Sequence, residues 1–161
     1  MFDAMIEWIR KDGSGNKFIT LLFDDFVVKY SVPKRELSES VALIYSELLH
    51  KCGDTNIRVS DLAEEGIQQM LRNKKIQGLG IVQDKLIKPI DPKEAPKLSL
   101  TKTELVIFMI DDLPELVGPT PTTVKNLTKF GNTAVDHSAP QVRKLGEKIL
   151  LKLFAIDPEA V

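Results

Sequence analysis

The sequence predicts an all-α fold, an α-solenoid of about four antiparallel helix pairs. Two stretches, 53–70 and 136–154, share one layout: a polar turn followed by a helix with matching apolar or small residues. Offsets of four, four and three residues between these positions are helical spacing rather than strand alternation. Repetition of such a unit is typical of helical solenoids. The matching positions are Val59, Ala63, Ile67 and Met70 in the first stretch and Val142, Gly146, Leu150 and Leu153 in the second.

Strand signals are weak, because no Asn-Gly or Asp-Gly two-residue turn joins two alternating apolar runs. A small residue one turn into each helix, Ala63 or Gly146, would let a second helix approach closely. We expect one domain over residues 1–161, with helix pairs at about 2–30, 36–72, 79–113 and 121–154. Asn73–Gly80 is predicted to be a basic connector, and the helix at Pro121 is predicted to use Thr120 as its cap.

Composition narrows the class of protein. Hydrophobic residues make up 43% of the chain and charged residues 28%, as in ordinary soluble globular proteins. The net charge of −1 predicts that any attraction to a charged partner comes from local patches. The single Cys52 excludes an internal disulfide, and no apolar run approaches the roughly 20 residues of a membrane span. We expect a cytosolic protein that binds neither nucleic acid nor membranes.

The sequence offers little for catalysis. His50 and Cys52 are too few for a zinc site, which needs three or four protein ligands. Gly78-Leu79-Gly80 lacks the Gly-Lys-Ser/Thr ending and the preceding strand of a phosphate loop. The adjacent acids at 24–25 and 111–112 point to different sides of a helix, so neither pair forms an acid–base dyad. We therefore expect no enzyme activity, no cofactor and no metal.

Basic residues recur in the predicted turns within the helix pairs, which would emerge on one edge of the stack. These turns, at 11–17, 53–58, 91–97 and 136–141, would present a row of cations to a large, flat, acidic partner. The competing interpretation is that exposed turns are polar in any protein. The cations in or beside the turns are Lys11, Lys17, Arg58, Lys93, Lys97, Arg143 and Lys144.

The pattern of Asp136, Val142-Arg143, Gly146 and Leu150 resembles the HEAT repeat signature. The order and unequal character of the helix pairs also resemble a TOG domain, the tubulin-binding HEAT array. More narrowly, three runs are similar to the TOG domains of centrosomal proteins found at ciliary tips, within a resemblance that spans about 18–161. These runs are KYSVPKRELSES, HKCGDTNIRVSDLAEEGIQQM and KNLTKFGNTAVDHSAPQVRKLGEKILLKLF.

The resemblance implies a partial TOG domain that binds tubulin and microtubules without catalysis. It implies a place in the cytoskeleton, at the cilium tip and at the centriole or centrosome, with other centriolar or ciliary-tip proteins as further partners. Carried over by position, the tubulin-binding residues on the turn edge would be Lys11, Asn16, Lys17, Thr55, Asn56, Arg58, Lys93, Lys97, His137, Ser138, Gln141 and Arg143.

Some features depart from the family pattern. Ser60 stands where HEAT repeats usually have Arg, and the turn at 91–97 is longer and richer in Pro. The first TOG repeat, whose turn carries an aromatic anchor, has no counterpart, and Trp8 is expected to pack inside a helix instead. We therefore expect an N-terminally truncated fragment. The alternative is a HEAT-type adaptor scaffold that binds a partner's peptide or helix along a helical face, with the apolar side of Phe2–Ile9 as its surface.

Overall fold

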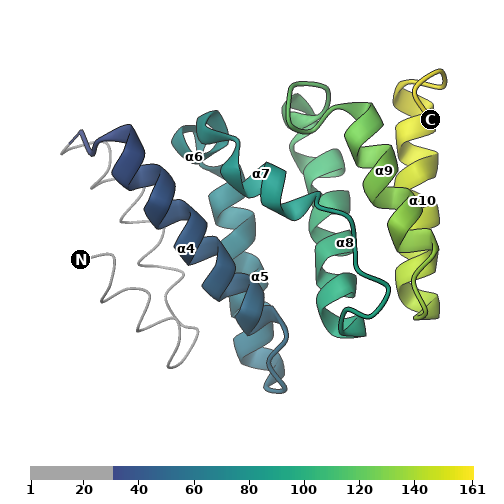
Figure 1. Cartoon of the computed structure of the whole chain (residues 1–161), viewed down its shortest axis with the longest axis horizontal. Helices are drawn as coiled ribbons and strands as arrows, with labels where there is room; N and C mark the ends of the chain where they lie inside the picture. Colours follow the sequence, from purple (N-terminus) through teal and green to yellow (C-terminus); the bar gives the residue numbers. More distant parts are fainter. Residues whose placement is uncertain (1–30) are drawn as a thin grey trace. The chain divides into compact units, whose positions relative to one another are not determined.

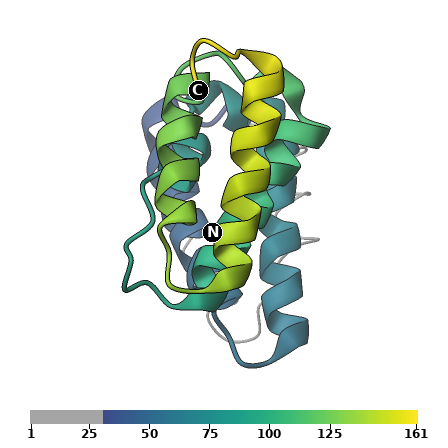
Figure 2. The same cartoon turned by 90° about the vertical axis from the view of Figure 1, so that its right-hand side faces the viewer.

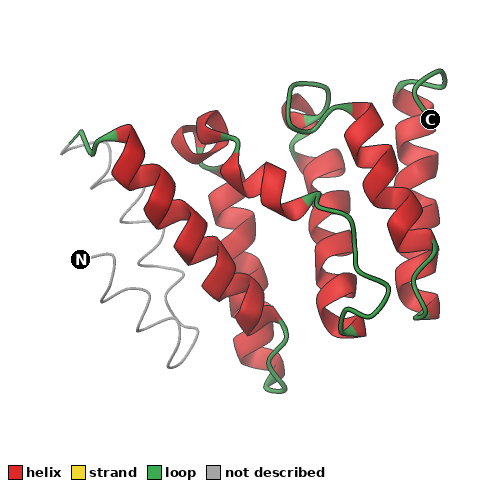
Figure 3. Cartoon of the chain, viewed as in Figure 1, coloured by secondary structure: helices red, strands yellow, loops and turns green. Residues whose placement is uncertain are grey.

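The computed structural model describes residues 31–161 (Figure 1). The chain divides into two compact units, Met1–Val82 and Gln83–Val161. Figure 3 shows only helices and loops in the described range, which confirms the all-α prediction. The helices are α4 (Lys34–Cys52), α5 (Ile57–Arg72), α6 (Lys74–Leu79), α7 (Ile81–Leu86), α8 (Pro96–Asp112), the 3-10 helix η2 (Pro114–Leu116), α9 (Val124–Val135) and α10 (Pro140–Ile156).

Several expectations fall outside the described residues. They are the first predicted helix pair, the apolar side of Phe2–Ile9, the turn residues Lys11, Asn16 and Lys17, and the packing of Trp8. None of the helices in 31–161 is long and apolar enough to cross a membrane.

In the first unit, α4 and α5 pack against each other through the apolar stripes that the sequence predicts. Leu37, Val41, Ile44 and Leu48 are buried on α4, while Ala63, Ile67 and Met70 are buried on α5. Ser60, which stands where HEAT repeats usually have Arg, is also buried, and its Oγ donates to the carbonyl of Cys52 at 2.8 Å. This hydroxyl therefore ties the first turn of α5 to the last residue of α4.

The prediction that Asn73–Gly80 forms only a connector is wrong, because this segment contains α6. Asn73 caps the helix, since its side chain accepts hydrogen bonds from the backbone N–H groups of Lys75 at 3.1 Å and Ile76 at 3.2 Å. Gly80, at φ 69°, ends α6 in the left-handed conformation that favours glycine. The first helix of the pair expected at 79–113 therefore begins after this glycine, as α7.

In the second unit, α10 packs against both α9 and α8, and Figure 2 shows α9 and α10 side by side. Val142, Gly146, Ile149 and Leu153 form the buried stripe of α10. Leu150 is only half-buried and lies against Gly131 of α9. The two helices approach closely at Gly146, where a Cβ would lie 2.8 Å from the backbone N of Val135. The small residue therefore permits close helix packing, as the sequence predicts.

The predicted start of the last helix pair is wrong by three residues. α9 begins at Val124 rather than Pro121, and its cap is Thr123 rather than Thr120. The Thr123 hydroxyl accepts a hydrogen bond from the Asn126 N–H at 3.2 Å. Before it, the N–H of Gly118 donates to the Thr122 carbonyl at 2.9 Å, which holds this segment in a turn rather than a helix. Either Thr satisfies the capping rule, so local sequence alone does not decide between them.

We expect Gly146→Ala to destabilise the fold. The new Cβ would meet the Val135 backbone N at 2.8 Å and the Ala134 Cβ at 2.9 Å, and neither atom belongs to a flexible side-chain end. Overpacking of this kind costs about 1–3 kcal/mol, which exceeds the roughly 0.5–1 kcal/mol that Ala gains over Gly in a helix. Urea unfolding followed by circular dichroism measures the difference.

Gly78→Ala is the matched control, because no atom lies within 4 Å of its Cβ position and Gly78 is in a helix. It should leave the free energy of unfolding unchanged or raise it slightly. If Gly146→Ala unfolds at the same urea concentration as the unchanged chain, the close approach of α10 to α9 does not limit stability.

Candidate functional site

The turn between α4 and α5 is fastened by its own polar side chains. A carboxylate oxygen of Asp54 accepts from the Asn56 N–H at 2.8 Å, and the Asn56 side-chain oxygen accepts from the Arg58 N–H at 3.1 Å. Asn56 is therefore the cap of α5. Thr55, Asn56 and Arg58, three of the residues predicted to face a partner, are all exposed.

Ile57 is an exposed residue of this turn that was not among the predicted contacts. Its side chain is 72% exposed, although an aliphatic residue is normally withdrawn from water. A signal was present, because Ile57 precedes Val59 by two residues and so falls outside the buried helical stripe of α5. The turn thus offers an apolar contact beside the Arg58 cation.

In the second unit, the loop before α8 and the turn between α9 and α10 lie side by side. The Nε2 atom of His137 lies 3.3 Å from the carbonyl oxygen of Glu94. The N–H of Ala139 donates to Nδ1 of the same ring at 3.1 Å, so Nδ1 carries no proton. With Nδ1 as the acceptor, Nε2 is left to donate to the Glu94 carbonyl, and the ring joins the two turns.

Glu94 also anchors its loop to α8. Its carboxylate accepts a hydrogen bond from the Ser99 hydroxyl at 2.7 Å and forms an ion pair with the Lys102 ammonium. Lys102 is buried, and a buried ammonium requires such a partner. The loop is thus held at one side chain by α8 and at its backbone by His137.

Arg143 completes the arrangement from the first turn of α10. Its Nη1 atom donates to the carbonyl of Ser138 at 2.7 Å and to that of His137 at 3.1 Å. These two carbonyls belong to the turn after α9, so the guanidinium holds that turn against the start of α10. A charge that the sequence placed among the partner contacts therefore has an internal partner.

The predicted site residues of this unit divide into two groups. His137 is 1% exposed and Arg143 is half-buried, so both hold the turns together. The sequence could not separate these groups, because spacing does not show which way a turn side chain points. The remaining predicted residues, all exposed on the two turns or the helix starts beside them, are Lys93, Lys97, Ser138 and Gln141.

Within residues 31–161 no group of three or more His, Cys, Asp or Glu side chains could hold a metal ion. The side chain of Cys52 is buried and forms no disulfide. Partial burial raises the pKa of Glu104 above its ordinary value, but Glu104 lies in the middle of α8, outside both turns.

Comparison with known proteins identifies relatives of this chain. A family described as the TOG domain of centrosomal protein CEP104 matches residues 14–149. The human centrosomal protein of 104 kDa is 25% identical over 138 residues, which cover 86% of this chain and 15% of the human protein. The mouse protein is 24% identical over 143 residues, which cover 88% of this chain and 15% of the mouse protein. The chain thus spans about 15% of the length of these relatives.

Two solved structures share the fold. One, of the CEP104 TOG domain, has a TM-score of 0.84 and 23% identity, and the match covers 99% of this chain and 65% of that one. The other, of the TOG domain of human Cep104, has a TM-score of 0.81 and 22% identity, with 99% and 66% of the chains covered. Because the family match takes in well over half of the sequence, the chain belongs to the family of CEP104 TOG domains.

Proposed function

We propose that this chain binds tubulin through the turns within its helix pairs and acts, without catalysis, at ciliary tips and centrioles. Membership of a TOG-domain family supports this function. The observation that carries it is the joining of two turns through His137 and Glu94. That contact gathers the exposed side chains of Lys93, Lys97, Ser138 and Gln141 at one end of the second unit.

The exposed cations of these turns suit contacts with acidic groups of a partner. The whole chain has a net charge of −1, so attraction has to come from a local surface. Lys93 and Lys97 supply two exposed cations in the second unit, and Arg58 supplies one in the first. Exposed cations of this kind steer association and set the orientation of a partner more than they set raw affinity.

The exposed Ile57 adds an apolar contact that charges alone do not provide. An aliphatic side chain that becomes buried on binding contributes in proportion to the area removed from water. Beside it, Thr55 and Arg58 can form the polar rim that usually surrounds such a contact in a protein–protein interface. The proposed interface therefore combines one apolar residue and one cation in the first unit.

The double variant Arg58→Glu/Lys93→Glu should bind tubulin about tenfold more weakly, because two cations that face an acidic surface become anions. Both side chains are exposed, so the fold should be unaffected. Gel filtration with purified tubulin measures binding, and circular dichroism monitors folding.

Lys34→Glu/Lys75→Glu is the matched control. It makes the same change in net charge at two exposed lysines, one at the start of α4 and one in α6. Both lie outside the α4–α5 turn and the loop before α8. Tubulin binding that is equally weak in both double variants would show that net charge matters and the turns do not. Binding that is unchanged in Arg58→Glu/Lys93→Glu would contradict the proposal directly.

The same electrostatic contribution predicts a dependence on salt. Raising the ionic strength past about 0.15 M shortens the Debye length below about 8 Å and should weaken binding by the unchanged chain. The Arg58→Glu/Lys93→Glu variant should lose much of this dependence, since it lacks the cations that salt screens. Equal salt slopes for the two proteins would count against the turn residues as contacts.

A third variant tests whether tubulin binding requires the two turns to be joined. His137→Ala leaves the Ala139 N–H and the Glu94 carbonyl without their ring partner, which should cost about 1–3 kcal/mol of stability. We expect it to lower both the thermal unfolding midpoint and tubulin binding. The control is His50→Ala. His50 is the other histidine of the chain and is exposed, so this change should alter neither quantity. Full tubulin binding by folded His137→Ala would mean that the joined turns are not the binding surface.

A further inference from the structure

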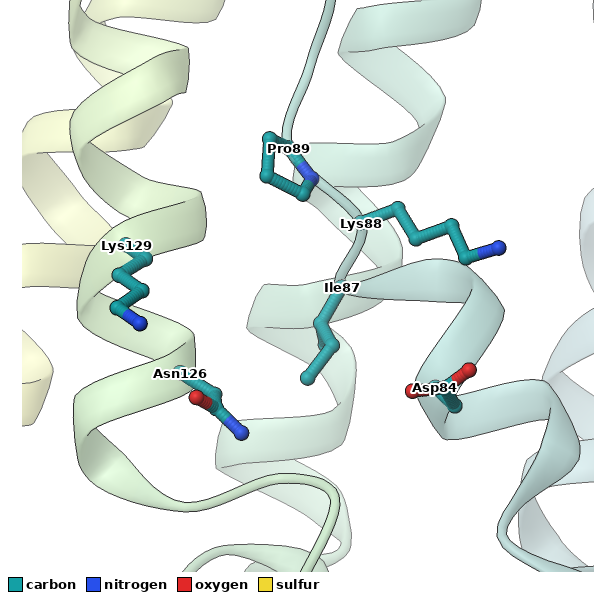
Figure 4. Close-up of a pocket in the computed structure, with 6 residues that line it drawn as sticks. All are labelled: Asp84, Ile87, Lys88, Pro89, Asn126 and Lys129. Atoms are coloured by element: carbon teal, nitrogen blue, oxygen red, sulfur yellow. The ribbon is translucent and has the colours of Figure 1, made fainter.

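A partly open pocket of about 180 Å³ lies in the second unit between α9 and the segment that follows α7 (Figure 4). Asn126 and Lys129 reach toward it from α9, while Ile87 approaches from the opposite side. This is a different surface from the turns, because none of its residues belongs to the loop 91–95 or the turn 136–139. The lining residues are Asp84, Ile87, Lys88, Pro89, Asn126 and Lys129.

Hydrogen bonds fix both walls of the pocket. The Ile90 N–H donates to the Thr133 hydroxyl oxygen at 3.1 Å, and that hydroxyl donates to the Phe130 carbonyl at 2.7 Å, so the segment after α7 is fastened to α9. On the opposite wall, the Asn126 side-chain NH2 donates to the Pro121 carbonyl at 2.8 Å. A preorganised surface loses less conformational entropy when a partner binds.

The charges at the pocket are unbalanced. Within the described range 31–161, neither Lys88 nor Lys129 forms an ion pair, and the one acid of the lining, Asp84, forms none either. Lys125 adds a further exposed cation one turn before Lys129. Two like charges four residues apart destabilise a helix, so the stability of α9 does not explain this pair.

Size and polarity narrow the class of ligand. Ile87 and Pro89 provide an apolar surface among the polar lining residues. A volume of about 180 Å³ is smaller than the roughly 300–1,000 Å³ of clefts that hold cofactors and drug-sized molecules. The pocket therefore suits a single aliphatic side chain with carboxylates beside it. A nucleic acid or lipid surface would meet the lysines but make no use of Ile87 and Pro89.

We propose that this pocket docks an acidic segment of a partner protein. One aliphatic side chain of the segment packs against Ile87 and Pro89, and the neighbouring carboxylates pair with Lys88 and Lys129. Complementary charge selects the partner, while the apolar contact fixes the position of the segment. The binding site is separate from the turns assigned to tubulin, so its test does not depend on that assignment.

The test uses a fluorescein-labelled peptide of three Glu-Leu-Glu-Glu repeats and the full chain. We expect saturable binding by fluorescence anisotropy, with amide shifts in the nitrogen-15 spectrum confined to residues near 84–90 and 125–133. Lys88→Glu/Lys129→Glu should weaken binding about tenfold, since both exposed ion pairs with the peptide are lost and the reversed charges repel it. Asp84→Asn should strengthen binding, because it removes the one acid of the pocket.

Lys144→Glu/Lys148→Glu is the matched control, because it makes the same change in net charge at two exposed lysines of α10, outside the pocket. It should leave peptide binding within about twofold of the unchanged chain. Three results would overturn the proposal: no saturable binding, an equal loss in both double variants, or equal affinity for a peptide with Ser in place of Leu. Binding of phosphatidylserine vesicles or poly(U) through the same lysines, without a preference for the Leu peptide, would assign the surface to another class of partner.

Discussion

The close approach of α10 to α9 at Gly146 is the constraint on which the second unit depends. The position of a Cβ there lies 2.8 Å from the backbone N of Val135, the residue directly before the turn between the two helices. Because the backbones meet at this point, the turn leaves α9 and enters α10 along one path. The buried stripe of α10 and the Lys152–Asp111 ion pair at 2.6 Å then hold α10 on both of its neighbours. Apolar packing thus decides where the turn lies.

Polar groups decide the shape of the turn itself. His137 hydrogen-bonds to the Glu94 carbonyl and Arg143 to the Ser138 carbonyl. Two side chains that were expected to contact a partner therefore bind the protein's own backbone. These bonds give the carbonyls of Glu94 and Ser138 partners within the protein. The consequence is that the exposed residues beside them stand on a fixed support. A binding surface built in this way loses little conformational entropy when a partner arrives.

The long helices were predictable because burial imposes a period on them. The α4–α5 pair spans 34–72 where 36–72 was expected, and α8 and α10 end within two residues of the expected 113 and 154. Shorter elements were harder. α6 has six residues, too few to show a period, and it depends on the Asn73 cap. At the turns, the sequence shows which residues are present but not which way their side chains point. His137 therefore counted as a contact although it is buried, and Ile57 was overlooked although it is exposed.

The segment from Ile87 to Glu94 contributes to both proposed surfaces, with one end at the pocket and the other at the joined turns. Two bonds to the α9–α10 hairpin secure it, from the Ile90 N–H to Thr133 and from His137 to the Glu94 carbonyl. A ligand changes affinity at a second site only when it favours one of two arrangements of the structure between them. The same hairpin holds the segment at Ile90 and at Glu94, which opposes a second arrangement of it. We therefore expect binding at the pocket and binding at the turns to be additive.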